Sequence, residues 1–353
     1  MRRPVTIRQV ARRARVAPST VSRVISGKGR VGEETKRRVI KAMEELNYHP
    51  NSLARSLVSG ASRKLGVMLP RMTGQWYQDT MITELLRGIA SSARKADYDL
   101  LLASGESGIE ELSSLDRLLQ GKRVDGVVLL GAGEDDRLLD RLTEAGFPFV
   151  RIGRHEFRTD ILSVDTDNRA AGQDAVRHLT ELGHEKIGFA IGPRGLTASW
   201  DRLEGYELAL KKSGIVPAKE WLLEGDALTL SANRTLSLFL GQPNPPTALV
   251  VGDDRLGIAV IRALAELGIP VPEKLALVAF NNSSMADWTT PSLTSMDIGI
   301  DQIGFEAVEL LLRSLTDGEL QGRSLTVPHR LVARESTLGT RRPGGIPFSA
   351  KPR

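Results

Sequence analysis

The sequence predicts an α/β protein with a small all-α headpiece at its N-terminus. Residues 1–60 hold 14 Lys/Arg and 4 Asp/Glu, a net charge of +10, whereas residues 61–353 hold 34 and 39, a net charge of −5. Beyond residue 61, short apolar runs alternate with amphipathic helical patterns, which is typical of parallel sheets covered by helices on both faces. We therefore expect a basic nucleic-acid-binding unit joined to a larger unit with a different task.

The headpiece is expected to form three short helices. Thr6 and Gln9 have the spacing of a capping box, which begins a first helix that runs to about Ala14. Pro18 suits the first position of a second helix, because its missing N–H has no intrahelical partner there. A third helix is predicted from about Glu33 to Leu46. Two short helices joined by a tight turn predict a helix-turn-helix, whose second helix enters the major groove of DNA.

An ordered run of motifs in this headpiece resembles the DNA-binding segment of the lactose-repressor (LacI) family. The matching segments are Val5-Thr6-Ile7, Val10-Ala11, Thr20-Val21-Ser22-Arg23-Val24, Leu46-Asn47-Tyr48 and Pro50-Asn51. Arg15 stands where the family commonly has a small turn residue, and Ala17 where it commonly has a capping Ser. The resemblance implies that a homodimer binds palindromic double-stranded operator DNA.

Residues 51–58 are too few for a stable helix in water. The resemblance implies that they form a hinge helix in the minor groove, where Leu57 wedges into the central base step. Alternatively, Leu57 is a core leucine that docks the linker on the next domain. The DNA contacts expected in headpiece and hinge are Thr6, Pro18, Ser19, Thr20, Ser22, Arg23, Asn51, Ala54, Arg55 and Leu57.

The rest of the chain is expected to bind a ligand at the carboxyl ends of parallel strands. Strands are predicted at 65–69, 99–103, 126–130, 149–152, 187–191, 248–251 and 275–280, and helices at 82–96, 168–182, 203–212 and 256–267. Motifs such as Val164-Asp165, Asp167-Asn168, Arg202-Leu203 and Pro291-Ser292-Leu293-Thr294 resemble the effector-binding core of the same family. That core is similar to periplasmic binding proteins, with two α/β lobes and three crossing segments, here placed near 157–163, 285–292 and 321–328.

These patterns give expected domain limits. The helix-turn-helix domain is placed at 1–50, the hinge helix and linker at 51–61, the effector-binding and dimerisation domain at 62–340, and a flexible tail at 341–353. Lobe 1 is expected at about 62–158 and 292–321, and lobe 2 at about 163–285 and 328–340. The tail is basic, rich in Pro and Gly and without leucine heptads, so we expect a dimer rather than a tetramer.

Planar hydrogen-bonding groups and aromatic faces at strand ends are suited to hydroxylated ligands. Arg202 aligns with the arginine that grips the effector in the family, although it could instead be a structural ion pair. Asp253 follows a predicted strand, and Asn281 stands where the family usually has Asp. One of the adjacent aromatic residues Trp76 and Tyr77 is expected to line the cleft. The effector residues expected are Trp76, Tyr77, Arg154, Arg202, Asp253 and Asn281.

A sugar or glycoside is the expected effector, because neutral polyhydroxyl ligands fit this mixed set and the resemblance implies carbohydrate. The alternative is a nucleobase or a sugar phosphate, for which Arg154 and Arg202 would supply positive charge. A different class of protein, namely a solute-binding protein or enzyme with a fused nucleic-acid anchor, is the second alternative.

The sequence gives no support for catalysis. It has no cysteine, and its five histidines lack the spacing of a zinc site. The Gly27-Lys28-Gly29-Arg30-Val31-Gly32 string follows a predicted helix rather than a strand, which argues against a dinucleotide site. No apolar stretch approaches 18 residues, and no signal peptide is recognisable. We expect a cytoplasmic regulator that is not an enzyme and has no cofactor and no membrane contact.

Overall fold

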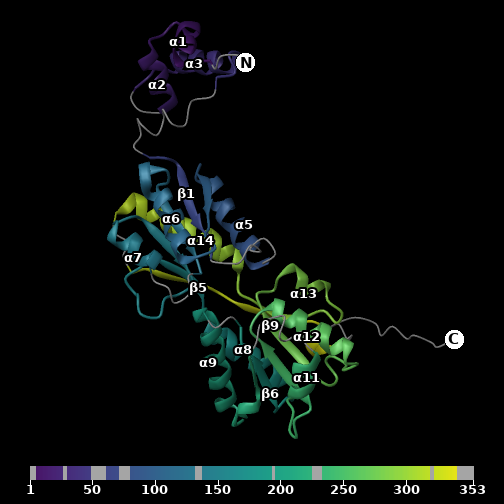
Figure 1. Ribbon diagram of the computed structural model, residues 1–353. Helices are drawn as coiled ribbons and strands as arrows, with labels where there is room; N and C mark the ends of the chain where they lie inside the picture. The colour runs from purple at the N-terminus through teal and green to yellow at the C-terminus, as the bar shows by residue number, and fades with distance from the viewer. Residues whose placement is uncertain are drawn as a thin grey trace, which may run out of the picture.

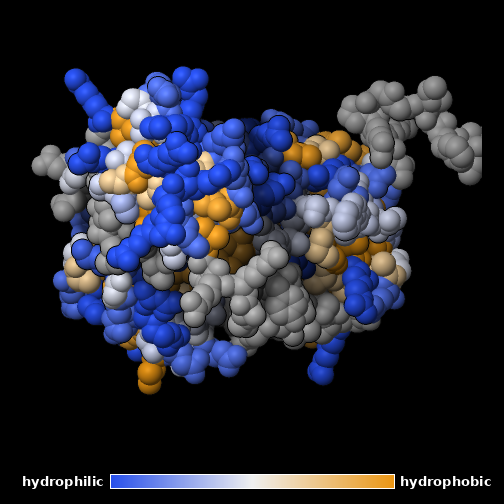
Figure 2. Space-filling model, turned by 90° about the horizontal axis from the view of Figure 1, so that it is seen from above, coloured by the Kyte–Doolittle hydropathy of each residue, from blue (hydrophilic) through white to orange (hydrophobic). Residues whose placement is uncertain are grey.

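A computed structural model describes residues 5–26, 30–48, 61–70, 80–131, 137–192, 195–224, 233–318 and 322–339. Figure 1 shows a helical headpiece and two α/β lobes, as the sequence predicted. Hydrophilic side chains cover most of the face in Figure 2, with apolar side chains in separate patches between them. The predicted hinge residues Asn51, Ala54, Arg55 and Leu57, the aromatic pair Trp76 and Tyr77, and the tail at 341–353 lie outside the described residues.

The headpiece consists of α1 (Ile7–Ala14), α2 (Pro18–Ser26) and α3 (Glu33–Glu45), which confirms the three predicted helices. At the start of α1 the Thr6 N–H donates to Gln9 Oε1 at 2.8 Å. Arg15 ends the helix with φ 55°, a left-handed conformation that favours small residues. The helices bury a common core of Val10, Ala11, Ala14, Val21, Val39 and Ala42.

Lobe 1 contains a fully parallel six-stranded sheet. Its strands are ordered β11 (Ser324–Val327), β5 (Ser163–Thr166), β4 (Phe149–Ile152), β3 (Gly126–Leu130), β1 (Lys64–Met68) and β2 (Asp99–Ala103). Helices α5 (Thr80–Lys95) and α14 (Ile300–Asp317) cover one face. Helices α6 (Gly108–Leu119) and α7 (Arg137–Glu144) cover the other, and the 3-10 turn η2 (Gln120–Lys122) follows α6.

Lobe 2 contains a second six-stranded sheet, parallel except at one edge. Its order is β12 (Arg330–Val332), β10 (Thr294–Asp297), β9 (Ala276–Phe280), β8 (Ala248–Val251), β6 (Ile187–Ala190) and β7 (Leu222–Leu223), with β12 antiparallel to β10. Helices α8 (Asn168–Glu181) and α9 (Thr197–Lys212) cover one face. Helices α11 (Asn233–Leu240) and α12 (Asp254–Glu266) cover the other. The short elements are η3 (Lys219–Trp221), α13 (Ser284–Trp288) and α15 (Glu335–Leu338).

The described residues cross between the lobes three times, but two crossings lie later than predicted. Strand β5 still pairs with β4 in lobe 1, and β10 still pairs with β9 in lobe 2. The crossings therefore fall between β5 and α8, between β10 and α14, and between β11 and β12. The expected crossings near 157–163 and 285–292 were wrong, and the one expected near 321–328 contains β11 of lobe 1, so the lobe limits drawn from all three change. The reason is that a crossing is set by backbone pairing, and the strand sequences Ser-Val-Asp-Thr and Thr-Ser-Met-Asp carry little apolar signal.

Candidate functional site

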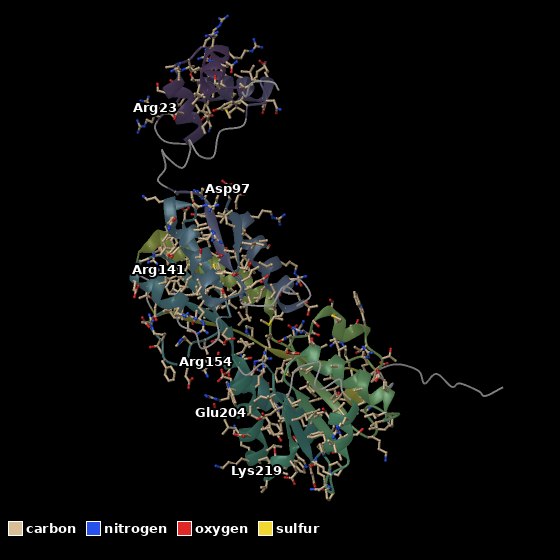
Figure 3. All side chains as sticks on the ribbon, viewed as in Figure 1. Arg23, Asp97, Arg141, Arg154, Glu204 and Lys219 are labelled. Atoms are coloured by element: carbon tan, nitrogen blue, oxygen red, sulfur yellow. The ribbon has the colours of Figure 1, made fainter. Side chains whose placement is uncertain are left out.

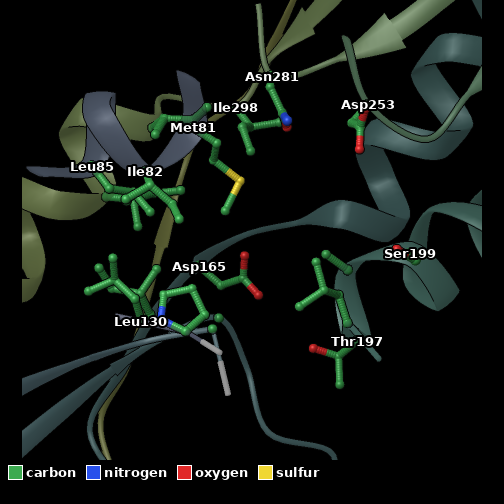
Figure 4. Close-up of a pocket in the computed structure, with 18 of the residues that line it drawn as sticks. Met81, Ile82, Leu85, Leu130, Asp165, Thr197, Ser199, Asp253, Asn281 and Ile298 are labelled. Carbon is green, nitrogen blue, oxygen red and sulfur yellow. The ribbon is translucent and has the colours of Figure 1, made fainter. Parts of the chain in front are cut away.

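A cavity of about 720 Å³ lies between the two lobes, at the carboxyl ends of both sheets. Figure 4 shows that apolar side chains, among them Met81, Ile82, Leu85 and Leu130, gather on one side of it. Polar side chains occupy the opposite side, which belongs to lobe 2. They come from Asn168, Thr197, Ser199, Arg202, Asp253 and Asn281. The cavity is large enough for a small molecule of several rings.

Arg202 is buried in the lobe 2 wall of this cavity, with 6% of its surface exposed. Its Nε donates to Asn168 Oδ1 at 2.9 Å, and its Nη1 donates to the Gly252 carbonyl at 2.6 Å. A longer contact of 3.4 Å joins Nη2 to Asn281 Oδ1, and the guanidinium lies 4.4 Å from the centre of the Phe280 ring. Burial lowers the pKa of Arg202 to about 10, so the side chain remains charged at neutral pH.

The position of Arg202 depends on a close contact between α8 and α9. A Cβ added to Gly172 would lie 2.4 Å from the Arg202 carbonyl oxygen, and one added to Gly205 would lie 2.1 Å from that of Arg169. Both distances are far shorter than any real carbon contact. Glycine at both positions therefore lets the two helix backbones approach, which brings Arg202 next to Asn168 at the start of α8.

Two adjacent carboxylates begin α12 and have different surroundings. Asp253 lines the cavity and caps the helix, because its Oδ1 accepts from the Leu256 N–H at 2.8 Å. Asp254 is 2% exposed and accepts from the Ser283 N–H and the Ser295 hydroxyl, both at 2.6 Å. Burial raises the pKa of Asp254 to about 6. Asp254 thus ties α12 to β10 and to the segment that follows β9.

The titration of Asp254 predicts a pH dependence of stability. The pKa of Asp254 rises from 3.8 to about 6 on folding, so the folded chain holds this proton more tightly. Its contribution to stability is complete below about pH 4 and is lost as the pH rises through 6. Between pH 4 and pH 7, the free energy of unfolding of the wild type should fall by about 3 kcal/mol relative to that of Asp254→Asn. This figure follows because one pKa unit corresponds to roughly 1.4 kcal/mol.

Urea titrations at several pH values measure this difference, with Asp317→Asn, an exposed acid at the end of α14, as the control. The control should follow the wild type at every pH. Parallel curves for wild type and Asp254→Asn would show that Asp254 does not titrate in this range.

Asn281 directly follows β9 and is held in an unusual backbone conformation. Its φ is 101°, a region that Asn adopts more readily than most residues. Its N–H donates to the Met296 carbonyl at 2.9 Å. The amide side chain therefore has a fixed place beside Arg202 at the cavity wall.

Arg154 is not among the described residues that line the cavity, in contrast to the prediction. Its Nε donates to Asp201 Oδ2 at 2.6 Å, and its Nη2 bonds the other oxygen of the same carboxylate. The Arg154 N–H donates to Asp165 Oδ2 at 2.8 Å. Arg154 follows β4 of lobe 1, and Asp201 lies on α9 of lobe 2, so the pair joins the lobes beside the cavity. Figure 3 labels Arg154 at this junction.

Sequence reasoning missed several residues of the cavity. Asp165 and Asn168 were identified only as motif residues, and Thr197 and Ser199 were not singled out. All four lie at a strand end or in the first turn of the helix that follows. The buried charged residues Glu111 and Arg151 also line the cavity from lobe 1 and carried no sequence signal.

The recognition helix α2 presents its predicted contact residues on the surface of the headpiece. Pro18, Ser19 and Arg23 are exposed, and Thr20 and Ser22 are half-buried. Thr6, at the start of α1, is exposed as well. Figure 3 shows Arg23 projecting outward from the headpiece.

Within the described ranges, no group of three or more His, Asp or Glu side chains is arranged to hold a metal ion. No helix in the same part of the chain is both long and apolar enough to cross a membrane.

Known protein families match both the headpiece and the two-lobed core of this chain. A family model described as "Bacterial regulatory proteins, lacI family" matches residues 6–51, and one described as "Periplasmic binding protein-like domain" matches residues 176–337. The HTH-type transcriptional regulator MalR of Streptococcus pneumoniae serotype 4 is 35% identical over 320 residues, which span 90% of this chain and 94% of the relative.

Two solved structures show the same architecture. The transcriptional regulator CelR–cellobiose complex has a TM-score of 0.72 and 31% identity, covering 95% of this chain and 100% of its own. The lac repressor dimer bound to operator and the anti-inducer ONPF has a TM-score of 0.81 and 27% identity. The match covers 95% of this chain and 99% of the lac repressor chain. These relatives are transcriptional regulators and not enzymes. From the headpiece through both lobes, the chain belongs to the lacI family of bacterial transcriptional regulators.

Proposed function

We propose that this chain is a repressor that binds palindromic operator DNA as a homodimer, and that a sugar or glycoside in the inter-lobe cavity controls its operator affinity. The observation that carries the proposal is the cavity itself, whose wall in lobe 2 contains the buried Arg202 and whose opposite wall belongs to lobe 1. A ligand that touches both lobes binds one lobe arrangement more tightly than another. It can therefore change the affinity for DNA.

The lining of the cavity favours a glycoside over the alternative ligands. Sugar hydroxyls match the polar side chains of lobe 2, and the apolar face of a sugar ring or an aglycone matches lobe 1. The charged side chains of the described lining nearly balance, which disfavours a sugar phosphate. They are four carboxylates (Glu111, Asp165, Asp253, Asp254) and three guanidiniums (Arg151, Arg202, Arg255). The complex of the relative CelR with cellobiose supports a carbohydrate ligand.

We assign ligand contacts to Arg202, Asp253 and Asn281, with one of Trp76 and Tyr77 completing the site. Asn168, Thr197 and Ser199 lie on the same wall and extend this set. Arg154 acts indirectly in this proposal, through its bonds to Asp201 next to Arg202. DNA contacts are assigned to the exposed residues of α2 and to the hinge, and the protein acts in the cytoplasm, where its DNA is.

Leu57→Ala should lower operator affinity and remove the bend in the operator. The proposed reason is that Leu57 of both subunits unstacks the central base step, most easily a flexible pyrimidine–purine step. Ligand affinity should stay unchanged. Gel mobility of circularly permuted operator fragments reports the bend, and a bend as large as that of wild type would return Leu57 to the role of a core leucine.

A stable dimer, joined through the effector-binding core, is expected in solution. The operator-bound lac repressor, a relative with the same architecture, is a dimer, which supports this expectation. Sedimentation equilibrium should therefore give twice the mass of the chain, and deletion of residues 341–353 should leave that mass ratio unchanged. A tetramer that needs the tail would contradict this.

Selection of binding sites from random duplex DNA tests the proposed function as a whole. The wild-type chain should enrich one palindromic sequence, and a thermal-shift screen should identify a sugar that stabilises the protein. A solute-binding protein with an unspecific nucleic-acid anchor would bind a sugar but enrich no sequence.

A further inference from the structure

The first described residues of the core, Ser62 and Arg63, are held firmly on lobe 1. The Ser62 N–H donates to Asp125 Oδ1 at 2.6 Å, and the Arg63 N–H donates to Asp125 Oδ2 at 2.9 Å. One carboxylate therefore binds two successive backbone amides. These contacts lie at the amino ends of β1 and β3, at the edge of the sheet opposite the cavity.

The side chains of Arg63 and Tyr98 add a second set of contacts. The Arg63 guanidinium lies 5.2 Å from the centre of the Tyr98 ring, and its Nη1 donates to the Ala96 carbonyl at 3.4 Å. Burial and the nearby Asp125 carboxylate, which hydrogen bonds with the Tyr98 side chain, raise the pKa of Tyr98. Figure 3 labels the neighbouring Asp97 at this end of lobe 1 and Arg154 at the other.

The backbone of Arg63 shows that these contacts impose a conformation. Its φ is 55°, a left-handed value that a residue with a long side chain seldom adopts. Such a conformation persists where the surroundings fix it. Here the Arg63 carbonyl also accepts from the Asp99 N–H at 3.0 Å, so the turn is bonded on both sides.

We propose that Asp125, Tyr98 and Arg63 form an anchor that fixes where the chain between headpiece and core leaves lobe 1. The inference rests on the proposed function, in which two headpieces must be presented at the spacing of two half-sites. An anchored exit raises the effective concentration of the second headpiece at its half-site, and a loosened exit lowers it. Asp125 is thus a positioning residue for specific DNA binding, although it is not itself one of the DNA contacts assigned above.

The test compares full-length variants on the duplex that the wild type selects and on a random duplex. Asp125→Asn keeps the size of the side chain but turns its amide group toward one backbone N–H, so operator affinity should fall severalfold. Affinity for random duplex, which depends on phosphate contacts, should stay within about twofold. Tyr98→Phe, which keeps the ring under Arg63, should show a smaller fall. Asp97→Asn removes the same charge from an exposed neighbour and should change nothing.

Amide hydrogen exchange gives a readout that does not depend on DNA. Exchange at Ser62 and Arg63 should be faster in Asp125→Asn than in the wild type or in Asp97→Asn. Unchanged operator affinity with faster exchange would overturn the anchor, and so would equal losses on both duplexes. If Asp125→Asn fails to fold, Tyr98→Phe decides by the same criteria. A wild-type chain that selects no duplex would overturn the proposed function together with the anchor, whereas an unchanged preference in the variants overturns the anchor alone.

Discussion

Arg202→Ala should abolish the response of operator binding to the sugar that stabilises the wild-type chain. The variant loses a guanidinium fork that holds Asn168, Gly252 and Asn281 at the cavity wall. It should also lose about 3 to 5 kcal/mol of stability, because buried acceptors and neighbouring carboxylates are left without their cation. Fluorescence anisotropy of labelled operator, with and without the sugar, measures the response, and calorimetry measures the loss of stability.

A milder substitution separates ligand binding from folding. Arg202→Lys keeps the positive charge but has no planar fork, so it should remain folded and still lose most of the response. Arg262→Ala removes an exposed arginine from α12 and serves as the control. A full response in Arg202→Lys, or in a folded Arg202→Ala, would place the ligand elsewhere. If both variants unfold, Arg202 has a structural role, which is the alternative that the sequence analysis kept open.

Arg23→Ala should reduce the preference for operator over random DNA by about 1 to 3 kcal/mol per half-site. Arg23 is exposed on α2, and arginine is the side chain best suited to bidentate hydrogen bonds with guanine N7 and O6. Loss of one such contact weakens specific binding and leaves most phosphate contacts in place. Competition titrations with operator and random duplexes at one salt concentration give the ratio directly.

An exposed arginine on α3 provides the control for this experiment. Arg37→Ala removes the same charge from the headpiece but not from the recognition helix. It should weaken binding to both duplexes equally or leave both affinities unchanged. If Arg23→Ala behaves as Arg37→Ala does, Arg23 contacts phosphate and the base readout belongs to other residues of α2, with Ser19 the next to test.

The helices and strands with strong patterns were predictable, and the weakly patterned ones were not. Strands such as β3 and β9 are fully buried runs of apolar residues and stand out in the sequence. In contrast, β5, β10 and β11 contain Ser, Thr or Asp at half or more of their positions and lie near the crossings. Their place in a sheet depends on partners that are distant in the chain. This is why the two lobes were predicted but two of their boundaries were not.

The candidate site was predictable where a residue lies in a recognisable motif at a strand end. Arg202, Asp253 and Asn281 were identified in this way, and all three line the cavity. Arg154 was predicted to contact the effector, and the structure shows its guanidinium bonded to Asp201 of the other lobe, which the sequence does not indicate. Glu111 and Arg151 were missed, since a charged residue within a helix or strand gives no indication of being buried at a cavity.

Operator affinity measured as a function of sugar concentration tests most directly whether the cavity controls DNA binding. The wild-type chain should change its operator affinity by about 5- to 150-fold as the sugar saturates, which corresponds to a coupling of about 1 to 3 kcal/mol. By linkage, operator DNA should change the sugar affinity by the same factor. A sugar that binds the cavity and leaves operator affinity unchanged would contradict the account.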